Sequence, residues 1–362
     1  MRKGFSLRDL DWVLLLTALA LAALGIVEIY STTMHTHLAG EYRKQIDWIL
    51  IGLLFAIVAS QIDYHIVLDQ SIALYVISVL GLLALLFIGH PVGGVRRWIS
   101  VGGLTFQVSE MVKLVIIICA AAYFASRRAK PVSWKDLMAL GIMAGLPAYL
   151  VVREPDLGTA LTFFPAIVAG IYFAGVRFRV LLVIALAAVC LAPLGWKLMR
   201  PYQRERLMTF VHPAADTRGS SYQVTQSKIA IGSGGFWGKG VGNGTQSRLG
   251  FIPVSHADFI FAAFAEEQGF AGTVVVLGLY FVLLIRLLDG AKSAGDRAGA
   301  FFVVGFTSVL LFQVVVNVGM MIGLLPITGI PLPLMSQGGS AVLFTFIGLG
   351  LAMSVRMRRL VN

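Results

Sequence analysis

The sequence predicts an all-α integral membrane protein with ten transmembrane helices and a long extracytoplasmic loop between the seventh and the eighth. The first observation is composition. Hydrophobic residues make up 58% of the 362 residues and charged residues 13%, whereas soluble domains average roughly 45–50% apolar and about 25% charged residues. The second is length, because most apolar runs are close to the roughly 20 residues that a helix needs to cross a bilayer. The third is that most charged residues lie between these runs.

Seven apolar runs precede the long loop. The first follows the basic start Arg2-Lys3, as in a signal peptide, but no small-residue cleavage site follows it and further spans do. This pattern favours an uncleaved first helix. The seven predicted spans cover residues 12–30, 46–62, 72–89, 104–125, 136–152, 157–175 and 179–196.

The segment 197–257 is the one sizeable polar part of the chain. At about sixty residues, and rich in glycine, it is too short for an independent core, so residues 1–362 are predicted to form a single polytopic membrane domain. Within it, residues 202–207 are expected to begin a basic amphipathic helix at the membrane surface, and residues 223–231 a second short helix. The glycine run 232–240 lacks the spacing of a nucleotide-binding loop, which favours tight turns beside the bilayer.

A proline-rich segment separates the last two predicted spans. Residues 324–340 carry no charge and are interrupted by Pro326, Pro331 and Pro333, so they cannot form a regular helix. Irregular backbone at membrane depth is stable only where protein or a water-filled cavity surrounds it. We therefore expect this segment to dip into the outer face and wall a site, with an ordinary surface loop as the alternative. The last three spans are predicted at residues 259–286, 299–323 and 339–355.

The distribution of Lys and Arg predicts that both termini are cytoplasmic. With the N-terminus inside, fifteen of these residues fall on the inner side and five in the short outer loops, as expected from the excess of positive charge in cytoplasmic loops. The loop 197–257 holds further cations, but long segments are translocated largely regardless of charge. The net charge of +11 therefore reflects membrane topology, and no nucleic-acid partner is predicted.

Charged residues within or beside the spans are functional candidates, because an ionised side chain at the centre of a membrane helix costs about 2.5–3.5 kcal/mol. Glu110 and Lys113 lie three residues apart on one face of the fourth span and can pair; a purely structural ion pair is the alternative. Arg153, Glu154 and Asp156 lie between the fifth and sixth spans. The alternative for this group is that Asp156 caps the sixth span while the other two are solvated.

A third charged group opens the eighth span. Asp258 precedes this span, and Glu266 and Glu267 follow roughly 12 Å further along the helix axis. For Asp258 the alternative is a simple N-cap. Cys119 and Cys190 lie in apolar spans, where cysteine behaves as a small hydrophobe, so neither a disulfide nor a metal cluster is predicted.

The predicted topology places most of these groups at the outer face of the membrane. A carboxylate among fixed positive charges, close to lipid, suits an amphiphile with an anionic head. A carboxylate that takes a proton from a substrate hydroxyl, beside cations that steady a phosphate leaving group, is a reasonable glycosyl-transfer site. One base suffices for inversion, whereas retention by double displacement needs a second carboxylate as nucleophile. The residues assigned to this face are Arg96, Arg97, Glu110, Arg153, Asp156 and Asp258.

Eight motifs resemble those of the SEDS family of bacterial cell-wall proteins, and together they extend over nearly the whole chain. Two of them, GTQS at 244–247 and GIPLP at 329–333, are more like the elongation branch of the family than its division branch. The other six are SEMVKL at 109–114, EPDLGT at 154–159, YQRER at 202–206, GFWGKG at 235–240, FIP at 251–253 and HADFIFA at 256–262. The chain departs from the family pattern at Val254, Ser255, Ala257 and Gln337, where Glu, a variable polar residue, Thr and Tyr are expected.

The resemblance implies a ten-helix peptidoglycan glycosyltransferase in the bacterial cytoplasmic membrane. The implied activity is the polymerisation of lipid II into glycan strands at the outer face, during cell elongation and shape maintenance. The implied partners are lipid II, the growing lipid-linked glycan strand, a class B penicillin-binding protein that crosslinks the product, and membrane proteins of the elongation complex. A lipid II flippase or another transporter is the alternative, disfavoured because the sequence has no paired repeats with helices broken at the midplane; a noncatalytic scaffold is a third hypothesis.

The resemblance also implies roles for single residues. By the match, Asp258 is the essential acidic residue and the general base for the acceptor hydroxyl, while Glu110 and Lys113 are the functional pair of the fourth helix. No metal ligand and no cofactor are assigned, and the participation of a divalent cation at the pyrophosphate is left open. The residues expected to contact substrate are Arg96, Arg97, Arg153, Glu154, Asp156, Arg204, Lys239, Ser336 and Gln337.

Overall fold

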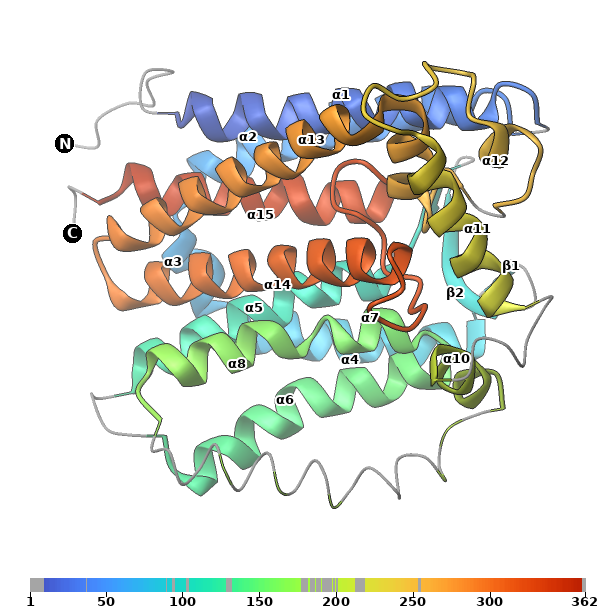
Figure 1. Cartoon of the computed structure of the whole chain (residues 1–362). Helices are drawn as coiled ribbons and strands as arrows, with labels where there is room; N and C mark the ends of the chain where they lie inside the picture. Colours follow the sequence, from blue (N-terminus) through green and yellow to red (C-terminus); the bar gives the residue numbers. More distant parts are fainter. Residues whose placement is uncertain are drawn as a thin grey trace.

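The computed structural model shows a bundle of helices that lie side by side along roughly one direction (Figure 1). The start of α1 (Trp12–Thr33) and the end of α15 (Gly339–Met357) lie together at one end of the bundle, here called the terminal end. The short helices α10 (Pro201–Val211), α11 (Ser220–Ser233) and α12 (Thr245–Arg248) lie at the other, here called the loop end. The structure describes residues 10–36, 38–88, 90–92, 95–101, 104–127, 132–176, 182, 186, 190, 197, 199, 201–211, 219–252 and 255–359.

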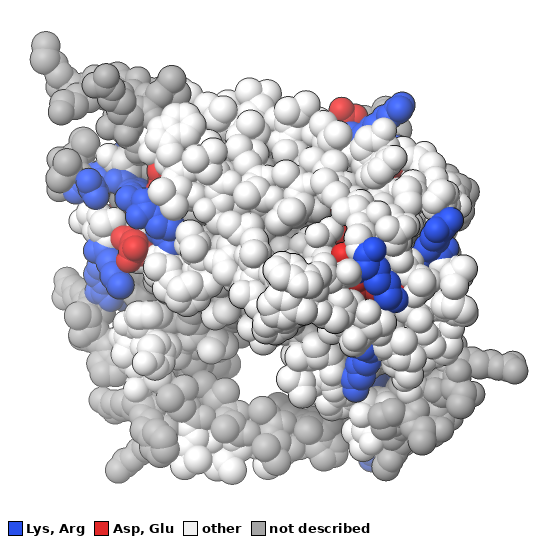
Figure 2. Space-filling model, turned by 45° about the horizontal axis from the view of Figure 1, so that its top comes forward, with Lys and Arg blue, Asp and Glu red and all other residues white. Residues whose placement is uncertain are grey.

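Seven of the described helices are long and apolar enough to cross a membrane. Figure 2 shows one face of the molecule, where charged side chains gather near the two ends and leave a broad uncharged belt between them. The predicted all-α membrane class is thereby confirmed. Besides α1 and α15, the long helices are α2 (Glu41–Gln61), α5 (Val108–Ser126), α6 (Trp134–Arg153), α13 (Ile260–Lys292) and α14 (Arg297–Met321). The shorter ones are α3 (Tyr64–Asp69), α4 (Ser71–Ile88), α7 (Leu157–Leu161) and α8 (Phe164–Phe173).

Nine of the ten predicted spans coincide with helices, and the seventh, 179–196, falls largely outside the described residues. The fourth prediction is wrong at its start. Residues 104–106 form strand β3 (Leu104–Phe106), which pairs with β2 (Val95–Val101), which in turn pairs with β1 (His90–Val92) in an antiparallel sheet. The sequence run continued from these apolar residues into α5 without a charge between them, so hydropathy alone did not separate strand from helix.

Two predicted spans are interrupted helices. The sixth consists of α7 and α8, which are separated at Thr162 and Phe163. The eighth, α13, is longer than predicted and is kinked at Gly269, where φ is 66° and ψ is −165°, a backbone conformation that is essentially restricted to glycine. A Cβ at this position would also collide with the backbone N–H of Gly238.

The glycine loop, residues 234–240, fills the kink of α13. The N–H groups of Lys239 and Gly240 donate to the carbonyls of Glu266 and Glu267, at 3.1 and 2.9 Å. In return, the N–H of Phe270 donates to the carbonyl of Gly235 at 2.9 Å. Backbone groups freed by the kink are therefore satisfied by protein, which is the condition for irregular backbone at membrane depth. The prediction of tight turns in this glycine run is confirmed.

Helices of the bundle approach closely where small residues face their neighbours. A Cβ at Gly350 in α15 would collide with the carbonyl of Ala56 in α2, and one at Gly348 would collide with the ring of Phe306 in α14. Membrane helices associate through such small residues because lipid provides no hydrophobic drive for packing. The larger core joins α1, α2, α13, α14 and α15, and a second core joins α4, α5, α6, α7 and α8.

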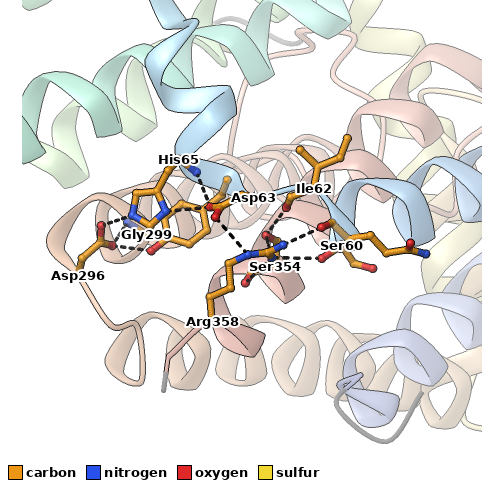
Figure 3. Close-up of polar contacts among 10 residues, drawn as sticks. Ser60, Ile62, Asp63, His65, Asp296, Gly299, Ser354 and Arg358 are labelled. Atoms are coloured by element: carbon orange, nitrogen blue, oxygen red, sulfur yellow. Dashed lines mark hydrogen bonds and ion pairs between the residues drawn. The ribbon is translucent and has the colours of Figure 1, made fainter. Parts of the chain in front are cut away.

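Polar contacts fasten the helices at the terminal end (Figure 3). The ring of His65 in α3 lies between two carboxylates, with Nδ1 2.8 Å from Asp63 and Nε2 2.9 Å from Asp296 at the start of α14. Arg358, just after α15, donates to the carbonyl of Gln61 at 2.6 Å and to Oγ of Ser354 at 2.6 Å. These contacts join the segment between α2 and α4 to the ends of α14 and α15.

Candidate active site

Asp258 lies at the loop end, immediately before α13. The helix takes Phe259 as its N-cap residue, so the alternative in which Asp258 is simply the cap is wrong. The side chain of Asp258 is half-buried. A half-buried carboxylate that is not used for capping can meet a substrate from the loop end.

The backbone around Asp258 is held by the proline-rich segment. Nδ2 of Asn317, in α14, donates to the carbonyl of Asp258 at 3.0 Å and to that of Ile330 at 2.8 Å. Oγ of Ser336 donates to the carbonyl of Ala257 at 2.7 Å. The segment from Ile322 to Gly338 contains no helix, and it is buried most continuously from Leu332 to Ser336. The prediction of irregular, buried backbone here is confirmed, and its packing against the Asp258 loop is what the wall of a site requires.

Three charged side chains act electrostatically on Asp258, and they come from three different parts of the chain. Burial raises the pKa of Asp258 above its usual range; the charge of Asp156 adds to the rise, while those of Arg206 and Arg97 oppose it. Arg206 belongs to α10, and its guanidinium donates to the carbonyl of Ile327 at 3.4 Å. The result is a carboxyl whose proton affinity is raised by burial and restrained by two fixed cations, a balance that suits a group that takes up a proton during a reaction.

Asp156 both caps a helix and joins the site. Its carboxylate accepts from the N–H of Thr159 at 3.0 Å, which caps α7 as the alternative expected. The same carboxylate lies 3.2 Å from a guanidinium nitrogen of Arg97 and accepts from Nε2 of Gln107 at 2.9 Å. Asp156 therefore links the sheet, the start of α5 and the start of α7.

Glu154 is buried rather than solvated, so that part of the alternative is wrong. Glu154 is the C-cap residue of α6 and is 2% exposed. Neither of its carboxyl oxygens has a hydrogen-bond partner among the described residues. Burial, reinforced by the charge of Asp156 and opposed by that of Arg97, raises the pKa of Glu154 to about 8. At neutral pH this group is mostly a neutral acid that can donate a hydrogen bond.

Glu110 and Lys113 form the predicted pair. The ammonium of Lys113 lies 2.7 Å from the carboxylate of Glu110, with both side chains buried, and 4.5 Å from the ring centroid of Phe344. Gln107 connects this pair to the site, because its carbonyl accepts from the N–H of Glu110 at 3.3 Å while its side chain binds Asp156. Glu110 follows Gln107 by one helical turn.

Several residues expected to contact substrate are engaged with other parts of the protein. Lys239 pairs with Glu266 at 2.7 Å, Arg204 donates to the carbonyl of Lys197 at 2.7 Å, and Gln337 donates to Glu41 at 2.6 Å. Arg153 is exposed and donates to the hydroxyl of Tyr149 at 3.1 Å. Oγ of Ser336 also accepts from the N–H of Leu332 at 2.8 Å. The side chain of Arg96 lies outside the described residues. Substrate contact by all of these residues stays a prediction.

The two glutamates inside α13 hold the loop. Glu266 accepts from the N–H of Thr245 at 2.8 Å and from that of Gln246 at 3.1 Å, in addition to its pairing with Lys239. Glu267 accepts from Oγ of Ser31, in α1, at 2.5 Å. These bonds compensate for the burial of the two carboxylates within an apolar helix. Among the described residues, no group of three or more His, Cys, Asp or Glu side chains is arranged to hold a metal ion.

Sequence reasoning missed three polar residues of this site: Gln107, Arg206 and Asn317. Arg206 lies in the YQRER motif, in which Arg204 was chosen instead. Asn317 carried a signal that was not used, since it is a fully buried amide within an apolar span. Gln107 gave no local signal, because its partners Asp156 and Ser340 are far from it in the sequence.

Comparisons with known proteins find relatives that match nearly the whole chain. The chain is 36% identical over 351 residues to the peptidoglycan glycosyltransferase MrdB of Escherichia coli K12, covering 97% of this chain and 94% of that protein. It is 31% identical to the peptidoglycan glycosyltransferase RodA of Treponema pallidum, covering 97% and 98%.

Solved structures show the same fold. The chain superposes with a TM-score of 0.84 and 34% identity on a chain of a structure described as "Structural coordination of polymerization and crosslinking by a peptidoglycan synthase complex", covering 98% of this chain and 99% of that one. For the rod shape determining protein RodA of Thermus thermophilus the TM-score is 0.72 at 29% identity, covering 98% of both chains. Residues 11–360 match the model of the FtsW, RodA and SpoVE family, described as "Cell cycle protein". The chain therefore belongs to this family, the SEDS family that its motifs resemble.

Proposed function

We propose that the chain is a peptidoglycan glycosyltransferase that polymerises lipid II into glycan strands, with Asp258 as general base and inversion at the donor sugar. The observation that carries this proposal is the environment of Asp258: a half-buried carboxyl, free of capping, between the charges of Arg97 and Arg206. The names of the relatives from Escherichia coli and Treponema pallidum support the same activity.

In the proposed reaction, the Asp258 carboxylate removes the proton of the acceptor hydroxyl while that oxygen attacks the anomeric carbon of the lipid-linked donor. The bond between this carbon and the diphosphate oxygen breaks, and its electron pair leaves with the lipid diphosphate. Arg97 and Arg206 offset the negative charge that develops there. Because burial raises the pKa of Asp258, its ionised form is a stronger base than an exposed aspartate.

The proposed setting is a bacterial cytoplasmic membrane, with the loop end outside and both termini in the cytoplasm. This orientation follows from the excess of Lys and Arg on the opposite side and brings Asp258 to the compartment where glycan strands are laid down. The partner is proposed to be a class B penicillin-binding protein that crosslinks the strands. The similar fold of a chain from a peptidoglycan synthase complex, described as coordinating polymerization and crosslinking, supports that partner.

The test is polymer formation from purified lipid II by the detergent-solubilised protein, with and without its penicillin-binding partner. General bases typically contribute about 10²–10⁴-fold, so Asp258→Asn is expected to reduce turnover at least that much while thermal unfolding stays unchanged. Asp289→Asn, at a partly exposed position near the end of α13, is the control and keeps its turnover. Unchanged turnover of the Asp258 variant contradicts the assignment.

A lipid II flippase is the second candidate, and the interruptions in α13 and between α7 and α8 favour it, because transporters often use broken helices. Against it, the kink of α13 is filled by the glycine loop rather than by a cavity. An experiment in lipid vesicles distinguishes flipping from polymerisation. A flippase moves fluorescent lipid II between leaflets whether or not Asp258 is replaced, and forms no strands even with the partner present.

A further inference from the structure

A pocket lies at the loop end between α10, α11 and the turn at residues 323–327. Its volume is about 60 Å³, room for on the order of five waters, which is close to the size of a phosphate group. Two cations, Arg206 and Lys228, contribute to its walls. The remaining polar side chains are three hydroxyl groups, and none of the lining residues that the structure describes is acidic.

Lys228 supplies a charge that no carboxylate in the described part of the chain neutralises. Its ammonium lies against the backbone of Gly323, so closely that a Cβ there would collide with it. Among the described residues, no ion pair or side-chain hydrogen bond involves this ammonium. An unpaired cation beside hydroxyl groups in a concave site suits an anion with several acceptor oxygens.

The rest of the lining is apolar. Phe210, Val224, Leu325 and Ile327 form most of the remaining wall, and the loop end is where the uncharged belt of the bundle gives way to charged side chains (Figure 2). An anion that enters this pocket therefore meets hydrocarbon on one side and cations on the other. That combination fits a phosphate group carried by a membrane lipid better than a free ion.

Arg206 connects the pocket to Asp258. It lines the pocket, and its charge also lowers the proton affinity of that carboxyl. The turn at residues 323–327 makes the same connection, because the carbonyl of Ile327 accepts from Arg206 and the segment continues to Ile330, which Asn317 ties to Asp258. Asp258 does not line the pocket, so an anion there would share Arg206 with the general base without occupying its place.

We propose that this pocket binds a phosphate group of a membrane-anchored lipid, namely one phosphate of the diphosphate of the lipid-linked donor. The inference rests on the proposed function, in which the bond from the anomeric carbon to the diphosphate breaks and leaves its electron pair on the diphosphate. Lys228 and Arg206 then neutralise the charge gained by this leaving group, while Asp258 receives the proton of the acceptor. Lys228 is thus a binding residue for the leaving group.

The experiment measures binding of farnesyl diphosphate, a short prenyl diphosphate, to the whole protein in detergent. Wild type and Asp258→Asn are expected to bind it alike. Lys228→Met is expected to weaken binding about tenfold or more, the effect of one charge-assisted hydrogen bond, and Lys228→Arg to retain most of it. Lys292→Met, which removes an exposed lysine at the terminal end, is the control and should bind as wild type. Equal affinity of Lys228→Met and wild type overturns the proposal.

Further arms separate the sources of the phosphate. Farnesol, which lacks phosphate, should not compete, and phosphatidylglycerol should compete at least tenfold more weakly than the diphosphate. Equal competition by phosphatidylglycerol would assign the pocket to a phospholipid headgroup and overturn the donor assignment. Failure of the proposed function looks different: Asp258→Asn would then polymerise as wild type, while the dependence of prenyl diphosphate binding on Lys228 would persist.

Discussion

Two carboxyls of the site have raised pKa values, and nearby charges act differently on each. The pKa of Glu154 is about 8, because burial and the charge of Asp156 outweigh that of Arg97. Asp258 also has a raised pKa, but two arginines oppose the rise. Environments that shift the pKa values of neighbouring carboxyls to different extents are typical of sites that move protons. We infer that Glu154 acts as a neutral acid and Asp258 as the base.

The pKa of Glu154 predicts the alkaline limb of the pH profile. Above pH 8 Glu154 loses its proton, and a new negative charge beside Asp156 repels the diphosphate. We expect polymerisation by wild type to fall above this pH, whereas Glu154→Gln, which stays neutral, should lack the fall and remain within about twofold of wild type at pH 7. The control is Glu205→Gln, at an exposed position of α10. Identical alkaline limbs in wild type and Glu154→Gln would contradict the role given to Glu154.

The pair of Glu110 and Lys113 predicts a separation of stability from activity. Removing one partner of a buried ion pair costs about 3–5 kcal/mol, because the other charge stays buried without compensation. Glu110→Gln should therefore lower the thermal unfolding temperature and turnover together. In the double variant Glu110→Gln/Lys113→Met stability should recover, since both charges are gone.

Turnover of that double variant decides what the pair does. If turnover stays low while stability returns, the pair has a functional role in the site, as the family resemblance implies. Recovery of both properties would leave the pair as a structural contact alone. The measurement is polymerisation and thermal unfolding of the same preparations in detergent.

At the scale of elements, the kink of α13 and the glycine loop form one unit. The loop satisfies the backbone groups that the kink exposes, and Glu266 and Glu267 bind the loop from within the helix. The kinked helix therefore depends on the loop for its backbone hydrogen bonds, and the loop depends on the kink for its binding site. The unit begins two helical turns beyond Asp258, so it also fixes the first part of α13.

Gly269→Ala should disrupt this unit. The left-handed backbone alone costs about 1–3 kcal/mol for a residue with a Cβ, and the collision with Gly238 displaces the loop. We expect lower thermal stability and faster tryptic cleavage after Lys239. Gly278→Ala is the matched control in the same helix, because a Cβ there meets nothing within 4 Å and alanine favours helix. Equal cleavage rates in the two variants would show that the loop does not depend on the kink.

At the scale of the whole molecule, the cluster around His65 joins helices that are distant in the sequence (Figure 3). Partial burial alone lowers the pKa of His65, but hydrogen bonds and charges from Asp63 and Asp296 outweigh it and raise the pKa above 6.5. The pKa values of both aspartates are lowered, although burial opposes this, by their hydrogen bonds and by nearby positive charge. The cluster is therefore most stabilising when His65 is charged and the aspartates are ionised.

These shifts predict how stability depends on pH. The contribution of His65 is fully present below pH 6.5 and is lost as pH rises through its raised pKa; that of the aspartates is lost as pH falls below about 4. His65→Gln should therefore lower the unfolding temperature more at pH 6 than at pH 8.5. His35→Gln, at an exposed position of the loop end, is the control. A pH-independent difference between wild type and His65→Gln would contradict this account.

Features that depend on neighbours in the sequence were predicted. The long helices follow from apolar runs of sufficient length, the two short helices of the loop from local patterning, and the irregular segment near Pro331 from its prolines. The pair of Glu110 and Lys113 also followed from helical spacing alone. Strand β3 and the break between α7 and α8 were missed. Apolar residues continue through both, and hydropathy alone does not distinguish a strand or a helix break from a continuous helix.

The sequence by itself determined the membrane class, most of the helices and the chemical nature of the candidate base, because hydrophobicity and helical period act over short distances along the chain. Only the tertiary structure decided which charged and polar groups surround Asp258. Arg97, Arg206 and Asn317 come from a strand, a loop helix and a membrane helix. Lys239, which was expected to contact substrate, pairs with Glu266. The physical reason is that charge and hydrogen bonding act through space, so their partners are fixed only once the helices have packed.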